Sequence, residues 1–70
     1  MKNTIKIQRA IKDMTQAELA EKIQVSRQTI NAIELGKYIP STLLALRMAK
    51  VFDVGVETIF QLEENECKNA

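Results

Sequence analysis

The sequence predicts an all-α fold, a compact bundle of five helices in one domain, with a short strand at the chain termini left open. Two glycines and one proline are the strong helix breakers among 70 residues, and apolar side chains recur at spacings of three and four. Apolar residues make up 46% of the chain and charged residues 27%, so we expect a packed core and not a disordered chain.

The first expected helix covers residues 5–13. Ile7, Ile11 and Met14 stand at positions i, i+4 and i+7, which places them on one face of a helix, and the basic residues of the segment lie elsewhere around it. We therefore expect these three apolar side chains to form the buried face.

The second expected helix begins at Gln16. Thr15 and Glu18 form a capping box, in which the threonine hydroxyl accepts from the amide of Glu18 and the glutamate carboxylate accepts from the amide of Thr15. The apolar spacing breaks at Gln24, so about three residues separate this helix from the next. Its inner face is formed by Leu19, Ala20 and Ile23.

The third expected helix covers Arg27–Glu34, because Ser26 is a favourable N-cap residue. Its apolar pair, Ile30 and Ile33, faces inward, and Gly36 follows as a left-handed cap. The residues left on or near the solvent-facing side are Arg27, Gln28 and Asn31.

A fourth helix over Thr42–Phe52 and a short fifth helix over residues 56–60 complete the expected bundle. Pro40 disfavours helical geometry at the residue before it, and Ser41 caps the fourth helix, whose apolar residues occupy much of its circumference. We expect one domain over residues 1–62, followed by a polar, acidic tail over residues 63–70.

The net charge of +1 is unevenly distributed. Residues 1–60 hold nine basic and six acidic side chains, whereas residues 61–70 hold one basic and three acidic ones. The acidic residues of the tail, Glu63, Glu64 and Glu66, would repel phosphate, so we expect the tail to lie away from any nucleic acid.

Three stretches carry a resemblance to a known family. Gln16-Ala17-Glu18-Leu19-Ala20, then Val25-Ser26-Arg27-Gln28-Thr29-Ile30, and then Ile33-Glu34 with Gly36 resemble the helix-turn-helix of the phage lambda Cro and repressor type, the xenobiotic-response-element family. The resemblance extends over roughly residues 5–60. It implies a lambda repressor-like fold and a small transcriptional regulator, with residues 1–62 as the domain that binds double-stranded DNA.

The resemblance makes the third helix the recognition helix, whose N-terminal residues reach base edges in the major groove. The expected base-reading residues are Arg27, Gln28 and Asn31. Arginine can bind guanine and glutamine can bind adenine through two hydrogen bonds, and Asn31 lies one turn on, next to Arg27. Thr29 is a further candidate. The alternative for each is a solvated polar residue on an amphipathic helix.

The expected phosphate contacts are Gln16, through its amide and side chain, together with Ser26, Lys37 and Tyr38. Lys37 and Tyr38 could equally belong to a solvated loop. The resemblance also implies an intramolecular ion pair between Arg9 and Glu34 that joins the first helix to the end of the recognition helix, and this pair is expected to be structural.

The chain departs from the family pattern at several positions. Gln24 stands where glycine is common, so either a left-handed non-glycine residue costs about 1 kcal/mol there or the turn has another shape. Leu35 replaces a polar residue that contacts phosphate. Gln8 stands where an apolar residue is usual and Ile11 where a charged one is usual, so the buried face is rotated or Ile11 contacts a partner.

A homodimer on an inverted repeat is expected, because two recognition helices then enter successive major grooves about 34 Å apart. The candidates for dimerisation are Phe60 and Leu62, with the extended residues 1–4 as a further candidate, forming a small two-stranded sheet. The alternative is that Phe60 only fills the monomer core and Leu62 begins a disordered tail.

Other functional classes fit the sequence less well. The chain has no histidine, no glycine-rich phosphate loop and no nucleophile–base set, so we expect neither an enzyme nor a cofactor. Cys67 is the single cysteine, which excludes an intrachain disulfide and a paired-cysteine metal site and fits a reducing cytoplasm. No membrane span and no room for a small-ligand domain are expected. The alternative is an antitoxin-like or adaptor protein whose main role is to bind a protein partner.

Overall fold

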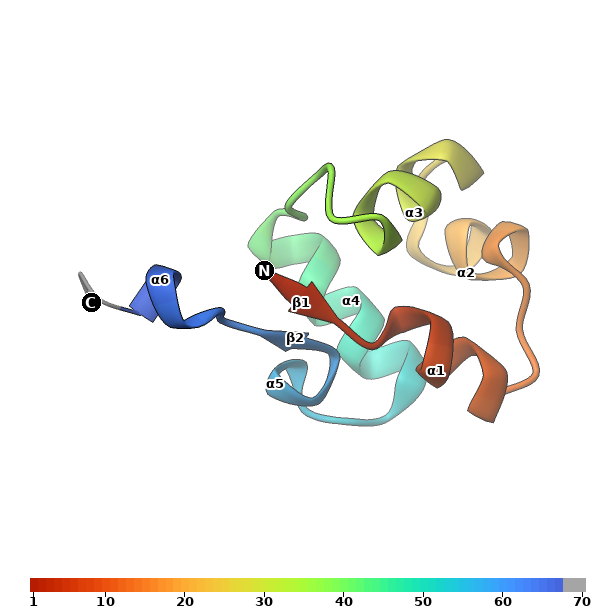
Figure 1. The fold of residues 1–70 in the computed structure, drawn as a ribbon. Helices are drawn as coiled ribbons and strands as arrows, with labels where there is room; N and C mark the ends of the chain where they lie inside the picture. The colour runs from red at the N-terminus through yellow and green to blue at the C-terminus, as the bar shows by residue number, and fades with distance from the viewer. Residues whose placement is uncertain (68–70) are drawn as a thin grey trace.

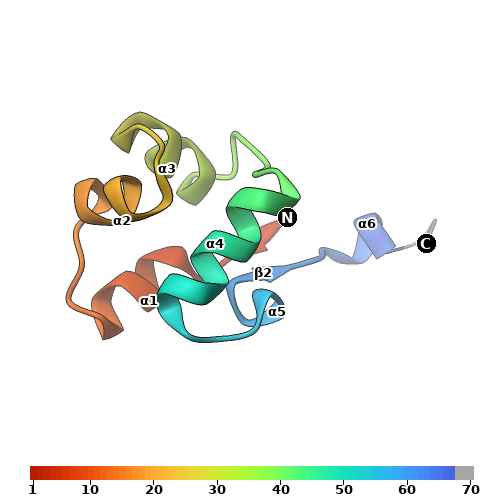
Figure 2. The same ribbon diagram turned by 180° about the vertical axis from the view of Figure 1, so that it is seen from behind.

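The computed structural model describes residues 1–67 and contains six helices and one two-stranded sheet (Figure 1). Figures 1 and 2 both place α3 at the edge of the helical bundle, while the C-terminal α6 projects away from it. The elements in chain order are β1 (Lys2–Asn3), α1 (Ile5–Ile11), α2 (Gln16–Ile23), α3 (Arg27–Glu34), α4 (Thr42–Phe52), α5 (Val56–Ile59), β2 (Phe60–Gln61) and α6 (Glu64–Cys67).

The starts of α2, α3 and α4 are confirmed, and each is set by a local cap. The hydroxyl of Thr15 accepts from the amide of Glu18 at 3.1 Å, and the carboxylate of Glu18 accepts from the amide of Thr15 at 3.0 Å. The donating amide and hydroxyl of Thr15 lower the pKa of Glu18. Ser26 and Ser41 cap α3 and α4 in the same way, since each hydroxyl accepts from the amide three residues further on.

Each of the first four helices is followed by a residue in the left-handed conformation. These residues have φ angles between 53° and 77°, and two backbone hydrogen bonds close each helix end in a Schellman motif. Gln24 has a φ of 64°, so the turn before α3 holds a left-handed residue other than glycine, the first of the two alternatives expected from the sequence. The four residues are Asp13, Gln24, Gly36 and Asp53.

The core joins apolar side chains from α1 to α5. Leu19, Ile23, Ile30, Met48 and Ile59 are each 0% exposed, and Met14, Val25 and Phe60 are among the half-buried residues packed against the core. No helix within residues 1–67 combines the length and the apolar character that crossing a membrane requires.

The prediction for the first helix is wrong in its buried face and in its end. Ile7 is 58% exposed and Ile11 68% exposed, whereas Ile5 and Gln8 are buried. Positions 7 and 11 each lie about 200° around the helix from Arg9, and Arg9 faces inward to pair with Glu34. An inward Arg9 therefore turns both isoleucines to solvent. The helix ends at Ile11, before the left-handed Asp13.

The segments β1 and β2, near the two ends of the described chain, pair in a short sheet. A short strand at the termini was a possibility that the sequence left undecided. β1 and β2 pair antiparallel, with Lys2 opposite Gln61 and Asn3 opposite Phe60. The fifth helix therefore ends at Ile59, one residue earlier than expected, because Phe60 adopts an extended conformation. The expected acidic tail begins with α6, a sixth helix that the sequence did not predict, and its residues 68–70 lie outside the described chain.

Candidate nucleic-acid interface

The geometry of the site begins with the packing of α3 against α2. Leu19 and Ala20 of α2 and Ile30 and Ile33 of α3 are all less than 5% exposed and share one core. Ala20 is small, which allows the two helices to approach closely. Burial of the apolar side of α3 leaves its other side to solvent at the edge of the bundle (Figure 1).

Three of the four predicted base-reading residues are exposed on α3. They are Arg27, Gln28 and Asn31, and the Asn31 oxygen also accepts from Gln16. Thr29 is half-buried, and its hydroxyl lies 2.9 Å from that of Ser26. Ser26 also accepts from the amide of Thr29, so its hydroxyl caps α3, and the hydroxyl of Thr29 contacts this capping group. The side chains of the two exposed residues of the first turn, Arg27 and Gln28, make no hydrogen bond or ion pair with residues 1–67.

Gln16 was predicted as a phosphate contact, but its side-chain amide donates hydrogen bonds to two residues of the protein itself. Its Nε2 donates to Glu34 Oε1 at 3.2 Å and to Asn31 Oδ1 at 3.3 Å. A carboxamide nitrogen carries two hydrogens, and these two contacts use both. What Gln16 can still offer to an anion is its backbone N–H in the first turn of α2, where the helix dipole favours negative charge.

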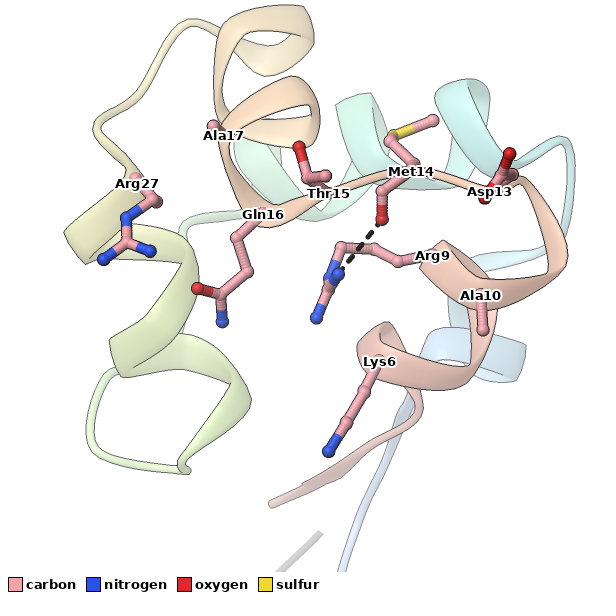
Figure 3. Close-up of a pocket in the computed structure, with 9 residues that line it drawn as sticks. All are labelled: Lys6, Arg9, Ala10, Asp13, Met14, Thr15, Gln16, Ala17 and Arg27. Carbon is pink, nitrogen blue, oxygen red and sulfur yellow. Dashed lines mark hydrogen bonds between the residues drawn. The ribbon is translucent and has the colours of Figure 1, made fainter.

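Arg9 and Glu34 form an ion pair between α1 and the end of α3. Arg9 Nε lies 2.7 Å from Glu34 Oε2 and Nη2 lies 3.2 Å from Oε1, a two-pronged geometry. The two side chains are 14% and 10% exposed. A third bond, from Arg9 Nη1 to the carbonyl of Met14 at 3.0 Å, fixes the segment that leads into α2 (Figure 3).

Lys37 and Tyr38 lie beyond the opposite end of α3 from Arg27. Both are exposed, and they follow Gly36 in the loop to α4. α3 has eight residues and is therefore about 12 Å long. The predicted phosphate contacts thus lie in three places. Ser26 caps the start of α3, Gln16 at the start of α2 contacts Asn31 and Glu34 in the second half of α3, and the two loop residues follow its end.

The structure adds two residues that the sequence did not single out. Asn3 Nδ2 donates to the carbonyls of Ile33 and Glu34 at 3.0 and 3.4 Å, so the N-terminal segment caps the end of α3. Arg47 Nη1 donates to the carbonyl of Ile23 at 3.2 Å, at the end of α2. Both contacts link residues more than 20 positions apart, which no local pattern reveals.

A surface cleft of about 530 Å³ opens between α1 and the starts of α2 and α3 (Figure 3). Arg9 and Gln16 line it, and Lys6 and Arg27 stand on its two sides. Lys6 was not among the predicted contacts, although it stands one helical turn before Arg9 on α1. Among residues 1–67, no three or more Cys, Asp and Glu side chains gather closely enough to hold a metal ion.

The predicted dimerisation residues have different surroundings. Phe60 is half-buried and packs against the core of its own chain, while Leu62 is 61% exposed. Cys67 is a free, exposed thiol in α6. Leu62 is followed by Glu63 and then by α6.

Comparisons with known proteins agree with this geometry. Residues 5–59 match the helix-turn-helix family. The chain is 54% identical over 66 residues to an uncharacterized HTH-type transcriptional regulator of Methanocaldococcus jannaschii, an alignment that covers 94% of this chain and 100% of that protein. It is 48% identical over 64 residues to the uncharacterized HTH-type transcriptional regulator YgzD of Bacillus subtilis, covering 91% and 97% of the two chains. An uncharacterized HTH-type transcriptional regulator of Archaeoglobus fulgidus is 47% identical over 66 residues, covering 94% and 93%.

Proposed function

The chain belongs to the helix-turn-helix family of transcriptional regulators of the Cro and repressor type, and from this premise we propose that it binds one DNA sequence as a homodimer and represses transcription. The observation that carries the proposal is the outer side of α3, where Arg27, Gln28 and Asn31 are exposed while the apolar side is buried. An exposed helix of this kind fits the B-DNA major groove, which is about 12 Å wide. Arg27 and Gln28 are the proposed base-reading residues of its first turn.

Phosphate contacts on both sides of α3 complete the proposed binding mode. The backbone amide of Gln16 and the start of α2 would hold one strand, and Lys37 and Tyr38 past the end of α3 would hold the other. Ser26 supports this binding mode by capping α3, and the Thr29 hydroxyl contacts the capping hydroxyl of Ser26. The acidic residues of α6 lie on the part of the chain that projects away from the bundle, where they would not oppose DNA (Figures 1 and 2).

The homodimer is proposed from the needs of recognition. One recognition helix contacts only a few base pairs, and a two-fold pair placed on an inverted repeat doubles the contacts. Leu62 is the better of the two predicted interface residues, because it is exposed while Phe60 already packs in its own chain. We place this activity in the cytoplasm, with access to DNA, and without a catalytic step or cofactor.

Selection of bound duplexes from a random DNA pool tests the proposal. We expect an inverted repeat whose half-sites are about one helical turn apart. Sedimentation of the protein with the recovered duplex should give two chains per duplex. Recovery of no common sequence, at a protein concentration that gives complete binding, contradicts sequence-specific recognition.

A role dominated by a protein partner is the second candidate. The observation in its favour is the pair of exposed isoleucines on α1, Ile7 and Ile11, which are 58% and 68% exposed. The ionic-strength dependence of binding separates the two candidates. A DNA binder that neutralises several phosphates loses affinity steeply as salt rises, with a log–log slope close to minus the number of contacts. A flat response, or no affinity for duplex DNA, favours the protein partner.

A further inference from the structure

A chain of polar contacts runs from α1 through the start of α2 to the outer face of α3. The guanidinium of Arg9 donates twice to the carboxylate of Glu34, which in turn accepts from Gln16 Nε2. The same Gln16 nitrogen donates to Asn31 Oδ1 at 3.3 Å. Asn31, a predicted base-reading residue, is therefore in contact with a network whose inner end is largely buried.

The chemistry of this network decides which way each carboxamide faces. A carboxylate accepts hydrogen bonds and donates none, so Gln16 must turn its NH₂ group toward Glu34. Figure 3 shows the other atom of this carboxamide, its oxygen, on the side of Arg27. Because the Gln16 nitrogen is a donor only, Asn31 must offer it an oxygen. The carboxylate of Glu34 thus determines the orientation of both carboxamides, that of Gln16 directly and that of Asn31 through Gln16.

We infer that Gln16 is a positioning residue that presents Asn31 to DNA with its amide nitrogen outward, as a hydrogen-bond donor. The inference rests on the proposed function and concerns the base pair that Asn31 faces. In the major groove guanine, adenine and thymine each offer an acceptor, whereas cytosine offers only its amino group, a donor. An outward donor on Asn31 therefore disfavours cytosine at the position that Asn31 contacts.

The preference of Asn31 has a different origin from the usual reading of adenine by asparagine. That reading uses the oxygen and the nitrogen of the carboxamide together. Here the oxygen is turned toward Gln16, from which it accepts one hydrogen bond. The nitrogen of the carboxamide is therefore the group directed at the base. We expect guanine, adenine and thymine to differ little at this base and cytosine to bind about three- to tenfold more weakly.

The decisive variant is Asn31→Asp. Aspartate keeps an oxygen for Gln16 and replaces the outward NH₂ by a second oxygen, an acceptor that matches the amino group of cytosine. The probe is the duplex recovered by selection with the unaltered protein, together with versions carrying each of the other base pairs at every position of one half-site. We expect cytosine to change from the weakest to the strongest base at a single position. Asn65→Asp, which adds the same charge in α6, serves as the matched control and should leave every preference unchanged.

Gln16→Ala tests the positioning step separately. Without its fixed partner the Asn31 carboxamide can turn, so the discrimination against cytosine should weaken toward equal binding of all four bases at that position. Gln28→Ala should alter another position and leave this one intact. Thermal unfolding of each variant is measured as well, to show that every variant is folded at the temperature of the DNA titrations.

The outcomes separate this inference from the proposed function. If the unaltered protein selects a sequence but Asn31→Asp leaves cytosine the weakest base, or Gln16→Ala leaves all preferences in place, the donor assignment is overturned and DNA binding stands. A protein that selects no sequence at all overturns the proposed function and the inference with it.

Discussion

Two arginines on the same cleft, Arg9 and Arg27, have opposite surroundings. Arg9 is paired through two bonds with Glu34, and the side chains of the pair are 14% and 10% exposed. Arg27 stands at the exposed start of α3 with no ion-pair partner among residues 1–67. Arg9 thus stabilises the fold, because its guanidinium is paired with a carboxylate of the same chain. The guanidinium of Arg27 is available to a phosphate or a base of a bound partner. The comparison predicts that changes at the two places act on different measured quantities.

Removal of Glu34 should give the largest effect, and on stability. Glu34→Ala leaves the guanidinium of Arg9 largely buried without its carboxylate and takes an acceptor from Gln16, so we expect the free energy of unfolding to fall by about 2–4 kcal/mol. For a domain of this size each kcal/mol lowers the unfolding midpoint by about 4–8 °C. Thermal and urea unfolding measure this. Glu21→Ala, an exposed glutamate of α2, is the control, and an equal loss in both variants would remove the distinction between the two arginines.

Changes at the start of α3 should act on affinity instead. Arg27→Ala and Gln28→Ala should each weaken binding to the selected duplex by about 1–3 kcal/mol, the free energy of a lost two-bond base contact. The unfolding midpoint should stay nearly unchanged, because both side chains are exposed. Titration of a labelled duplex measures the affinity, and a melting curve of the same protein sample measures the unfolding midpoint. A variant that melts much earlier than the unaltered protein would contradict its assignment to the binding surface.

The turn between α2 and α3 connects the two regions and offers a change of intermediate size. Gln24 holds a φ of 64°, which glycine adopts without strain, so Gln24→Gly should raise the free energy of unfolding by up to about 1 kcal/mol. Gly36→Ala, at a φ of 77° with open space for a methyl group, should lower it by a similar amount. Urea unfolding measures both. A loss of stability in Gln24→Gly would show that this side chain contributes more than the strain it imposes.

The smallest expected effect comes from the loop past the end of α3. Lys37→Ala should weaken binding to all duplexes alike and reduce the log–log salt slope by about one, because one phosphate contact is lost without any contact to a base. Affinities at three or more salt concentrations, for the selected duplex and for an unrelated one, measure the slope. A changed preference between the two duplexes would make Lys37 a base-reading residue.

Local chemistry in the sequence was enough to predict three helices residue by residue. α2, α3 and α4 begin after Thr15, Ser26 and Ser41, whose hydroxyls act on amides three residues away. The exposure of Arg27 and Gln28 also follows from the sequence, since Ile30 and Ile33 leave one buried side for α3. Such predictions succeed because every group that decides them lies within one or two helical turns.

The rest was decided by contacts between distant segments. The apolar spacing of α1 pointed to Ile7 and Ile11 as buried, but the ion pair from Arg9 to Glu34, 25 positions away, turned that face to solvent. The pairing of β1 with β2, the capping of α3 by Asn3 and the two bonds from Gln16 to α3 likewise join residues at least 15 positions apart. The sequence alone determined where α2, α3 and α4 begin and which polar side chains of α3 face away from the core. Tertiary structure decided how those side chains are held, because the orientation of a polar group depends on the partner that packing brings to it.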